Sequence, residues 1–475
     1  MKVLFVAPEL PPYSKVGGLG DVSAALSKAL LALGVDTRVF TPLYGGIQPG
    51  PAWRPHPSPF PVRMPGKTCH GRLWETEHPE SAVPVAFLEY NDYFEREGVY
   101  GPPDNSHAFG DNGQRFAFFS RAAIDYCDHV GWFPDVIHCH DWTTGLLPSF
   151  INNQTGSSNW TPSTVLTLHN LEHQGVFGPE VAEFAGLPSS GIEINFLREG
   201  LAQATALTTV SPTYADEIQS SPGGWGLESL LKSCSHDLYG ILNGIDMEAW
   251  DPARDSALSH PFSHEDPGGK GLVKSALQKE MGLRVDSQSP LFGVVSRLYA
   301  QKGLDLLAAC LPPLLAAHND AQLVILGSGD TAQEDAFQSL ARNHTEQVAV
   351  ATRFDEGLAR RIYGGSDFFV MPSRFEPCGL SQLYAMRYGT VPVVRRTGGL
   401  TDTVRSADSA DGTGILFQQA TPKALGEALL RALQLYGDPA AMQAIRQNAF
   451  GEDFSWDSPA RAYLDLYQKV SGTTG

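Results

Sequence analysis

Two groups of polar residues in the carboxyl-terminal third of the chain follow short apolar runs. Residues 368–371 form a run typical of a fully buried strand, and Arg374 and Glu376 come directly after it. Residues 391–394 form a second such run, which leads into the sequence Arg-Arg-Thr-Gly-Gly at 395–399. In an open parallel α/β sheet, ligands bind beyond the carboxyl ends of the strands. A carboxylate, guanidinium groups and closely approaching glycine amides there suit an anionic leaving group beside a group rich in hydroxyls.

Two more cations lie between an expected strand and an expected helix. Residues 291–295 predict a strand and residues 304–317 a helix, with Arg297 and Lys302 between them. Such a pair could hold a diphosphate, although a solvated turn is the alternative. Phe354 follows another expected strand, residues 348–351, and we expect its ring to be partly exposed; a simple core or rim aromatic is an equal alternative to a ligand contact there.

The amino terminus has the order strand, glycine-rich turn, helix. Residues 2–7 predict a buried strand and residues 19–33 an amphipathic helix, with Lys15, Gly17 and Gly18 between them. The spacing of the glycines is not G-x-G-x-x-G, which disfavours a dinucleotide cofactor. A cation beside exposed N–H groups favours an anion site, whereas a tight loop with close helix packing is the alternative.

Histidines and an aspartate follow two further expected strands of the amino-terminal half. Residues 136–139 lead into His140 and Asp141, and residues 164–168 lead into His169. His138 and His140 would share a face of their strand, but no third metal ligand stands at a diagnostic spacing, so a packed strand end is favoured over a metal site. Asn243 belongs to an Asn-Gly pair, which is first a turn signal.

The length and the α/β rhythm predict two doubly wound domains. A chain of 475 residues is too long for one ordinary core. Residues 250–271 are rich in Pro, Ser, Asp and His, as a linker or surface excursion is, and the alternation of strands and helices restarts near residue 290. Residues 53–90 predict an antiparallel excursion, and residues 193–203 a helix. We place one domain at residues 1–248, completed by a helix at 456–475, and the other at 249–455, with a cleft between their strand ends.

The composition is that of a globular protein, with 42% hydrophobic and 18% charged residues. The formal charge of −18 argues against a general nucleic-acid surface and gives no reason to expect a membrane partner. Six scattered cysteines fit a reducing compartment. The first residues run straight into a strand without signal-peptide organisation, so we expect a cytoplasmic protein, or a plastid one only if a transit peptide is missing from this chain.

These segments also carry a family resemblance. SRFEPCGLSQLYAMRYG followed by RRTGGLTDTV resembles the signature of bacterial glycogen synthases and plant starch synthases, which are retaining glycosyltransferases of the GT-B architecture. KVGGLGDV, HCHDWTTGLLP, LTLHNLEHQG and SRLYAQKGLDLL resemble further segments of the same family. The resemblance implies catalytic roles for Glu376, His169, Arg297, Lys302 and Asp141. It implies binding of the sugar-nucleotide donor by Lys15, Gly17, Gly18, Asn243, Thr397, Gly398, Gly399 and Phe354.

The activity implied is transfer of glucose from ADP-glucose to the non-reducing end of an α-1,4-glucan, with retention and with neither a metal nor another cofactor. The resemblance, not the residues, favours ADP-glucose over UDP-glucose. Wider retaining GT-B enzymes have a second glutamate eight positions after the first; here that position is Tyr384, as in the synthases. Val16 replaces a threonine common in bacterial synthases, which leaves a backbone-based phosphate site intact.

Two other functions stay open at this point. An α-glucan phosphorylase has the same architecture, but it would need a lysine bound to pyridoxal phosphate, and no motif for that lysine is found. A non-catalytic glucan-binding protein would bind glucan and release no nucleoside diphosphate. The joint presence of Lys15, Arg297, Lys302 and Glu376 argues against it.

Overall fold

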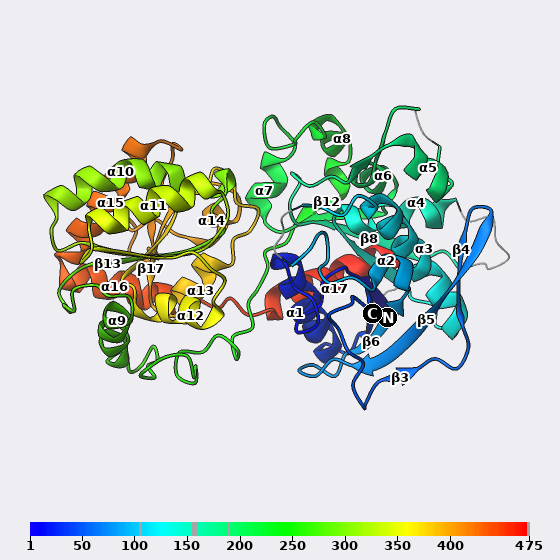
Figure 1. Cartoon of the computed structure of the whole chain (residues 1–475), viewed down its shortest axis with the longest axis horizontal. Helices are drawn as coiled ribbons and strands as arrows, with labels where there is room; N and C mark the ends of the chain where they lie inside the picture. Colours follow the sequence, from blue (N-terminus) through cyan, green and yellow to red (C-terminus); the bar gives the residue numbers. More distant parts are fainter. Residues whose placement is uncertain (104–106, 154–159, 189–190, 473–475) are drawn as a thin grey trace. The chain divides into compact units, whose positions relative to one another are not determined.

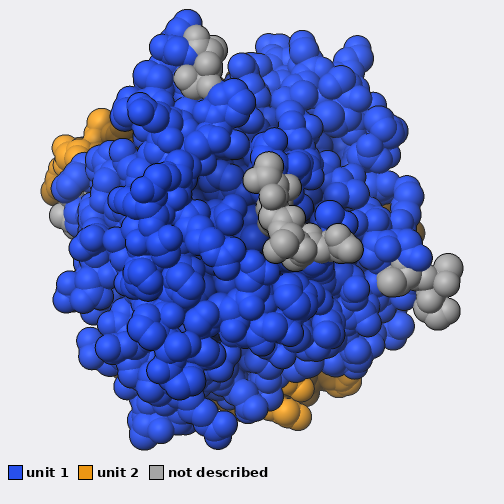
Figure 2. Space-filling model, turned by 90° about the vertical axis from the view of Figure 1, so that its right-hand side faces the viewer, with its two compact units in different colours: residues 1–244, 456–475 blue, residues 245–455 orange. Residues whose placement is uncertain are grey.

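The computed structural model describes residues 1–103, 107–153, 160–188 and 191–472. The chain divides into two compact units (Figures 1 and 2): unit 1 is Met1–Gly244 with Trp456–Gly475, and unit 2 is Ile245–Ser455. The sequence analysis places the first boundary after residue 248 and the second at residue 456. Residues 473–475 of the expected terminal helix lie outside the described residues.

Unit 1 is built on a mixed sheet with the strand order β12-β11-β8-β7-β1-β2-β6-β5-β3, and β4 pairs with β5. From β12 to β6 all neighbours are parallel, whereas β3, β4 and β6 pair with β5 antiparallel. The antiparallel excursion predicted for residues 53–90 is therefore confirmed. The strands of the sheet are β1 Lys2–Val6, β2 Asp36–Pro42, β3 Arg54–Pro55, β4 Phe60–Met64, β5 Lys67–Glu77, β6 Pro84–Glu89, β7 Val136–His140, β8 Ser163–Leu168, β11 Ala206–Thr209 and β12 Leu238–Gly240.

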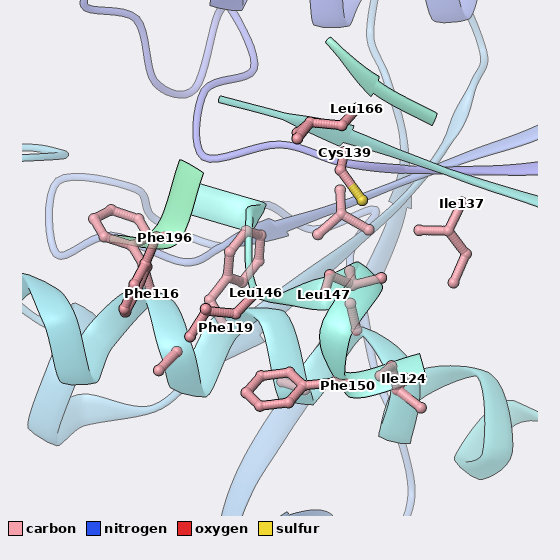
Figure 3. Close-up of a cluster of buried hydrophobic side chains, with 14 of the residues drawn as sticks. Phe116, Phe119, Ile124, Ile137, Cys139, Leu146, Leu147, Phe150, Leu166 and Phe196 are labelled. Carbon is pink, nitrogen blue, oxygen red and sulfur yellow. The ribbon is translucent and has the colours of Figure 1, made fainter. Parts of the chain in front are cut away.

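Helices cover both faces of this sheet, because successive residues of its buried strands point to opposite sides. In β1, Leu4 and Val6 join one apolar cluster, and Val3 and Phe5 join the other. The unit 1 helices are α1 Gly18–Ala32, α2 Asn91–Phe94, α3 Asn112–Val130, α4 Leu147–Asn152, α5 Pro179–Ala185, α6 Phe196–Gln203, α7 Pro212–Glu217, α8 Glu228–Ser233 and α17 Asp457–Ser471. Figure 3 shows part of the first cluster, in which Phe116 of α3 lies near Phe196 of α6, and Phe119 of α3 lies near Phe150 of α4.

The carboxyl-terminal helix α17 packs on the second face of the unit 1 sheet. Its Ala460, Tyr463 and Tyr467 are buried in the same cluster as Val3 and Phe5. The last helix of the chain thus completes the unit that the first strand begins.

The helix predicted for residues 193–203 begins later than expected. Residues 194–195 form a short strand, β10 (Ile194–Asn195), paired antiparallel with β9 (Val176–Phe177). Helix α6 starts only at Phe196, where the Asn195 side chain accepts a hydrogen bond from the Arg198 N–H as an N-cap. Capping chemistry therefore decides this boundary.

Unit 2 is a parallel six-stranded sheet with the order β15-β14-β13-β16-β17-β18. Its strands are β13 Leu291–Val295, β14 Gln322–Leu326, β15 Val348–Ala351, β16 Phe368–Met371, β17 Val391–Arg395 and β18 Ile415–Phe417. Its helices are α9 Gly269–Glu280, α10 Leu304–Ala317, α11 Thr331–Asn343, α12 Glu356–Gly365, α13 Ser381–Arg387, α14 Gly398–Thr403, α15 Pro422–Tyr436 and α16 Pro439–Phe450. The strand order turns from β13 in both directions, which is the doubly wound arrangement and puts a switch point between β13 and β16.

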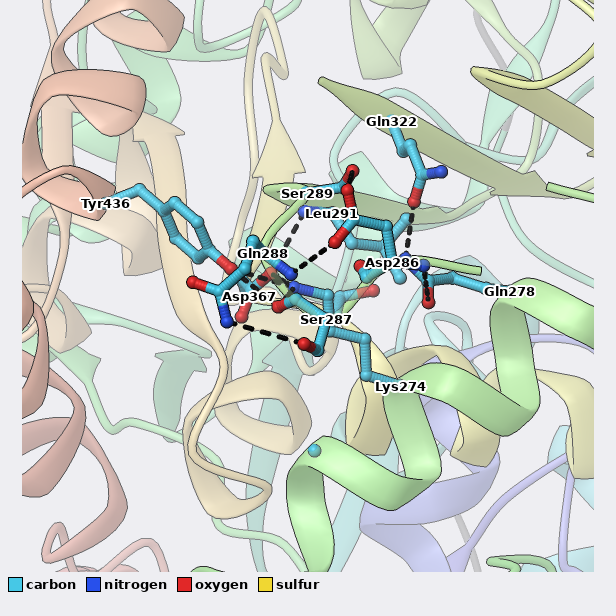
Figure 4. A network of polar contacts seen from close by, with 12 residues as sticks. Lys274, Gln278, Asp286, Ser287, Gln288, Ser289, Leu291, Gln322, Asp367 and Tyr436 are labelled. Carbon is cyan, nitrogen blue, oxygen red and sulfur yellow. Dashed lines mark hydrogen bonds and ion pairs between the residues drawn. The ribbon is translucent and has the colours of Figure 1, made fainter. Parts of the chain in front are cut away.

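A buried polar network lies at the opposite, amino-terminal edge of this sheet (Figure 4). Asp367 accepts hydrogen bonds from Lys274 Nζ at 2.7 Å, from the Leu291 N–H at 3.0 Å and from Arg446 at 3.1 Å. Two cations and one amide thus satisfy a carboxylate that is almost fully buried. The network fixes the starts of β13 and β16, whose other ends carry the candidate site.

Candidate functional site

Glu376 lies beyond the carboxyl end of β16, and hydrogen bonds from two side chains fix its carboxylate. Lys302 Nζ lies 3.0 Å from Glu376 Oε1 and 2.7 Å from Oε2, and the Ser373 hydroxyl donates to Oε2 at 2.9 Å. Only 5% of Glu376 is exposed. Lys302 ends a 3₁₀ turn, Ala300–Lys302, that follows β13. The turns after the two neighbouring strands at the switch point therefore join a carboxylate and an ammonium group, a pairing that the sequence did not predict.

The glycine pair after β17 holds the backbone of Glu376. Gly398 has a φ of +45°, and a Cβ there would lie 2.0 Å from the Glu376 carbonyl oxygen. The Gly399 N–H donates to that oxygen at 3.1 Å. We expected these glycines to bring amides to a ligand. The structure shows that they first allow close contact between two turns of the protein itself.

The arginines of this region are already engaged with the protein. Arg374 forms an ion pair with Asp305 at 2.7 Å. Arg395 donates from Nε to the Ser373 carbonyl oxygen at 2.7 Å and also bonds the Arg374 carbonyl oxygen. Arg396 is exposed. Arg374 and Arg395 therefore shape the turn that carries Glu376.

Three exposed side chains follow other strands of the unit 2 sheet. Arg297, after β13, is exposed, and its Cζ lies 5.6 Å from the ring centre of Tyr299, which is 44% exposed. Phe354, after β15, is 88% exposed. Single exposed apolar side chains are common on protein surfaces, so exposure alone assigns Phe354 no role.

The glycine loop of unit 1 encloses a carboxylate that the sequence analysis missed. Glu9 Oε2 accepts hydrogen bonds from the N–H groups of Val16 at 2.7 Å and Gly17 at 2.9 Å, and the Tyr100 hydroxyl donates to Oε1 at 2.7 Å. Burial raises the pKa of Glu9, and the two amides oppose that shift. The Gly17 amide, which we expected to face a phosphate, is thus bonded to the protein's own anion.

Lys15 lies on the exposed side of the same loop. Its Nζ forms an ion pair with Asp21 at 2.6 Å, and nearly half of its side chain is exposed. Gly18 begins α1, so its amide belongs to the first turn of that helix. An acidic residue between a strand and a glycine turn was the only sequence signal for Glu9.

Asp141 and His169 lie together after the neighbouring strands β7 and β8. The His169 N–H donates to Asp141 Oδ1 at 2.7 Å. The backbone of Asp141 has a φ of 52° and a ψ of −164°, a conformation that residues other than glycine rarely adopt. Burial raises the pKa of Asp141 to about 7, against the lowering effect of the His169 and Asn170 amides. Strain and a shifted pKa at one residue are typical of a functional position.

The three histidines of these strand ends are not arranged as metal ligands. His138 bonds Thr167 Oγ1 at 2.6 Å and the Tyr467 hydroxyl at 2.7 Å, and His140 Nδ1 lies 3.1 Å from His169 Nε2. Burial lowers the pKa of all three rings, that of His169 to about 3, so they are uncharged at neutral pH. In the described part of the chain, no cluster of three or more His, Cys, Asp or Glu residues could hold a metal.

Asn243 lies beyond β12 and is 7% exposed. Among the described residues, nothing donates a hydrogen bond to its buried Oδ1. A buried amide oxygen without a donor is costly, so it marks a place where a ligand hydroxyl would be favoured. Thr397, also nearly fully buried, is the N-cap of α14.

Two compact units, each built on parallel strands with polar side chains beyond their carboxyl ends, are the GT-B architecture of glycosyltransferases. The sequence profile described as "Starch synthase catalytic domain" matches residues 2–233, and that of "Glycosyl transferases group 1" matches residues 279–450. The chain belongs to the glycogen synthase and starch synthase family.

The similarity to known proteins extends over almost the whole chain. The chain is 46% identical to the glycogen synthase of Anaeromyxobacter dehalogenans and 44% identical to that of Rhodospirillum rubrum, with 99% of each chain covered in both comparisons. The solved catalytic domain of starch synthase IV from Arabidopsis thaliana, bound to ADP and acarbose, superposes with a TM-score of 0.90 at 33% identity, covering 99% of both chains. Among the described residues, no helix has both the length and the apolar character needed to cross a membrane.

Proposed function

We propose that the protein transfers glucose from ADP-glucose to the non-reducing end of an α-1,4-glucan such as glycogen, with retention of the anomeric configuration. The observation that carries this proposal is the Lys302–Glu376 pair, fixed by Ser373 and by the Gly398–Gly399 turn at the switch point of a parallel sheet. The starch synthase IV structure, which holds ADP and acarbose, supports a nucleotide and a glucan-like ligand.

The leaving diphosphate gains negative charge as the glycosidic bond breaks. Lys302 and the exposed Arg297 follow β13, where they would stabilise that charge. Preorganised charged donors of this kind are often the largest contribution to catalysis. Phe354, with its ring exposed, would stack on the base.

Glu376 would hold the hydroxyls of the glucose or stabilise positive charge on its ring. A double displacement would also need a carboxylate nucleophile. Asp141 is a poor one, because its pKa is near 7 and its Oδ1 accepts the His169 amide. We therefore favour attack by the acceptor hydroxyl from the side of the leaving phosphate.

The unit 1 residues would bind the rest of the donor. Lys15 and the first turn of α1 at Gly18 would face the diphosphate, because cations and helix N-termini both favour anions. His169, Asp141 and Asn243 would contact the glucose.

The test is release of nucleoside diphosphate, with ADP-glucose and UDP-glucose compared in parallel, each with and without glycogen. We expect glycogen-dependent release that is faster with ADP-glucose. Faster release with UDP-glucose would show that the proposed donor is wrong, while the proposed glucose transfer would still hold. No release with either donor would contradict the proposal.

A further inference from the structure

His140, the last residue of β7, is a fully buried histidine with no role in the chemistry described above. Its ring lies between two others: the ring centres are 4.3 Å from His138 and 5.3 Å from His169. On another side it stacks on Phe5 at 5.7 Å. Among the residues that the structure describes, the His140 side chain makes one hydrogen bond, which joins Nδ1 to His169 Nε2 at 3.1 Å.

The proton of this hydrogen bond can be placed. His140 Nε2 is buried, and within the described residues it has no hydrogen-bond partner. A neutral imidazole carries one proton, and a buried N–H without an acceptor is rarer than an acceptor without a donor. The proton of His140 therefore belongs on Nδ1, where it has an acceptor, and it is donated to His169 Nε2. His169 is uncharged, so its own proton must be on Nδ1.

We propose that His140 is a positioning residue that fixes His169 as the tautomer protonated at Nδ1, which presents a hydrogen-bond donor to a hydroxyl of the transferred sugar. His169 is partly exposed, and among the described residues none accepts a hydrogen bond from its Nδ1. The assignment of a sugar hydroxyl as the partner of His169 rests on the proposed function. The assignment of the tautomer does not.

Neighbouring contacts support a built arrangement. Asp141 holds the main chain of His169 through its N–H at 2.7 Å, and His140 holds the ring, so two consecutive residues fix both parts of His169. His140 is itself fixed: its N–H donates to Thr144 Oγ1 at 2.6 Å, and the Thr143 hydroxyl donates to its carbonyl oxygen at 3.0 Å. These bonds hold the main chain of His140, and its ring packs against Phe5 and His138, so its Nδ1 can select one tautomer of its neighbour.

Two substitutions separate positioning from packing. In His140→Asn, the side-chain amide can place an N–H close to the position of Nδ1. In His140→Phe, a ring of similar size fills the space and lacks the donor. A merely structural role predicts that Phe, which has no unsatisfied nitrogen, preserves activity at least as well as Asn. The positioning role predicts the opposite order.

The readouts are the ¹⁵N spectrum of the histidine side chains and the steady-state kinetics with ADP-glucose and glycogen. We expect His169 to be protonated at Nδ1 in the wild type and to shift toward the Nε2-protonated form in His140→Phe, with its signals assigned from a His169→Ala spectrum. We expect kcat to fall about tenfold in the Phe variant and clearly less in the Asn variant, with the donor KM nearly unchanged. His173→Ala, in the exposed loop after His169, is the control and should match the wild type.

Either of two results would overturn the proposal: a wild-type His169 protonated at Nε2, or a Phe variant at least as active as the Asn variant. If the wild type transferred no glucose at all, the proposed function would fail. The ¹⁵N spectra of the wild type and the Phe variant would still decide whether His140 sets the tautomer.

Discussion

The polar groups that follow β7 and β8 in unit 1 differ from those that follow β16 in unit 2. In unit 2, Glu376 is paired with Lys302 and Arg374 with Asp305, so charge is matched by opposite charge. In unit 1, Asp141 and the three histidines are buried with no ion pair among the described residues, and burial shifts the pKa of each toward its uncharged form. At the ends of β7 and β8, unit 1 therefore presents uncharged histidines and an aspartate with a pKa of about 7, whereas beyond β16 unit 2 presents charges held in ion pairs.

This difference fits two tasks of one reaction. A sugar offers hydroxyls, which neutral donors and acceptors can recognise without desolvating a charge. A departing diphosphate needs positive charge that is already in place. Substitutions in one unit and in the other should therefore have different effects on activity and on its pH dependence.

The largest effect is expected at the charged pair of unit 2. Glu376→Ala and Lys302→Ala should each lower kcat by about 10²–10³-fold, because each removes a preorganised charge at the reacting group. Steady-state kinetics would measure this, with circular dichroism confirming the fold. Glu427→Gln, which breaks the exposed Lys423–Glu427 ion pair of α15, is the control and should change kcat less than about twofold. Wild-type rates in either alanine variant would remove that residue from the mechanism.

A smaller effect, and one that depends on pH, is expected at Asp141. Its pKa rises from 3.8 in the unfolded chain to about 7 in the folded one, so over that range the folded state binds the proton more strongly. Stability must then fall as pH rises through this window, because the charged form is disfavoured in the folded state. Asp141→Asn removes this pH-dependent loss of stability and keeps an oxygen that accepts the hydrogen bond of the His169 amide.

Urea unfolding of the wild type and Asp141→Asn at pH 5 and pH 8 checks this. From pH 5 to pH 8, we expect the free energy of unfolding of the variant to increase by on the order of 2–3 kcal/mol relative to that of the wild type. Equal pH dependence in the two proteins would show that Asp141 titrates normally.

An effect of about tenfold is expected at the buried anion of the glycine loop. Glu9→Ala leaves the Val16 and Gly17 amides without their acceptor, so the loop should lose its shape and the donor KM should rise about tenfold. Glu9→Gln keeps an acceptor oxygen and should stay within about threefold of the wild type. If the Gln variant were as impaired as the Ala variant, the charge of Glu9 and not the loop geometry would be what matters.

The smallest effect is expected at Phe354. Its replacement by alanine should raise the KM for the nucleotide-sugar about fivefold, since stacking of one base on an aromatic ring contributes about 1 kcal/mol or more. Stability should not change, because 88% of the residue is exposed. Val285→Ala, at an apolar residue of the same unit that is 56% exposed, is the control. An unchanged KM in Phe354→Ala would place the base elsewhere.

The sequence predicted the parallel strands well, because continuous apolar runs ending in glycine or charge are typical of them. Strand β16 and the position of Glu376 beyond its carboxyl end followed from this rule. The hydrogen-bond partners of these site residues within the protein could not be predicted. That Glu9 fills the glycine loop, and that Gly399 bonds the Glu376 carbonyl oxygen, depend on contacts between turns, which sequence spacing does not encode. The expected start of α6 was wrong for a similar reason, because the pairing of β10 with β9 and the Asn195 cap override helical spacing.

The central claim is that glucose passes from the donor to the glucan without inversion. Proton NMR of the wild-type protein with ADP-glucose and glycogen follows the anomeric signals of donor and product directly. The account predicts that the α-linked donor signal is replaced by an α-1,4-linked glucan signal as ADP accumulates. Appearance of a β-linked product, or of free glucose in place of glucan, would contradict it.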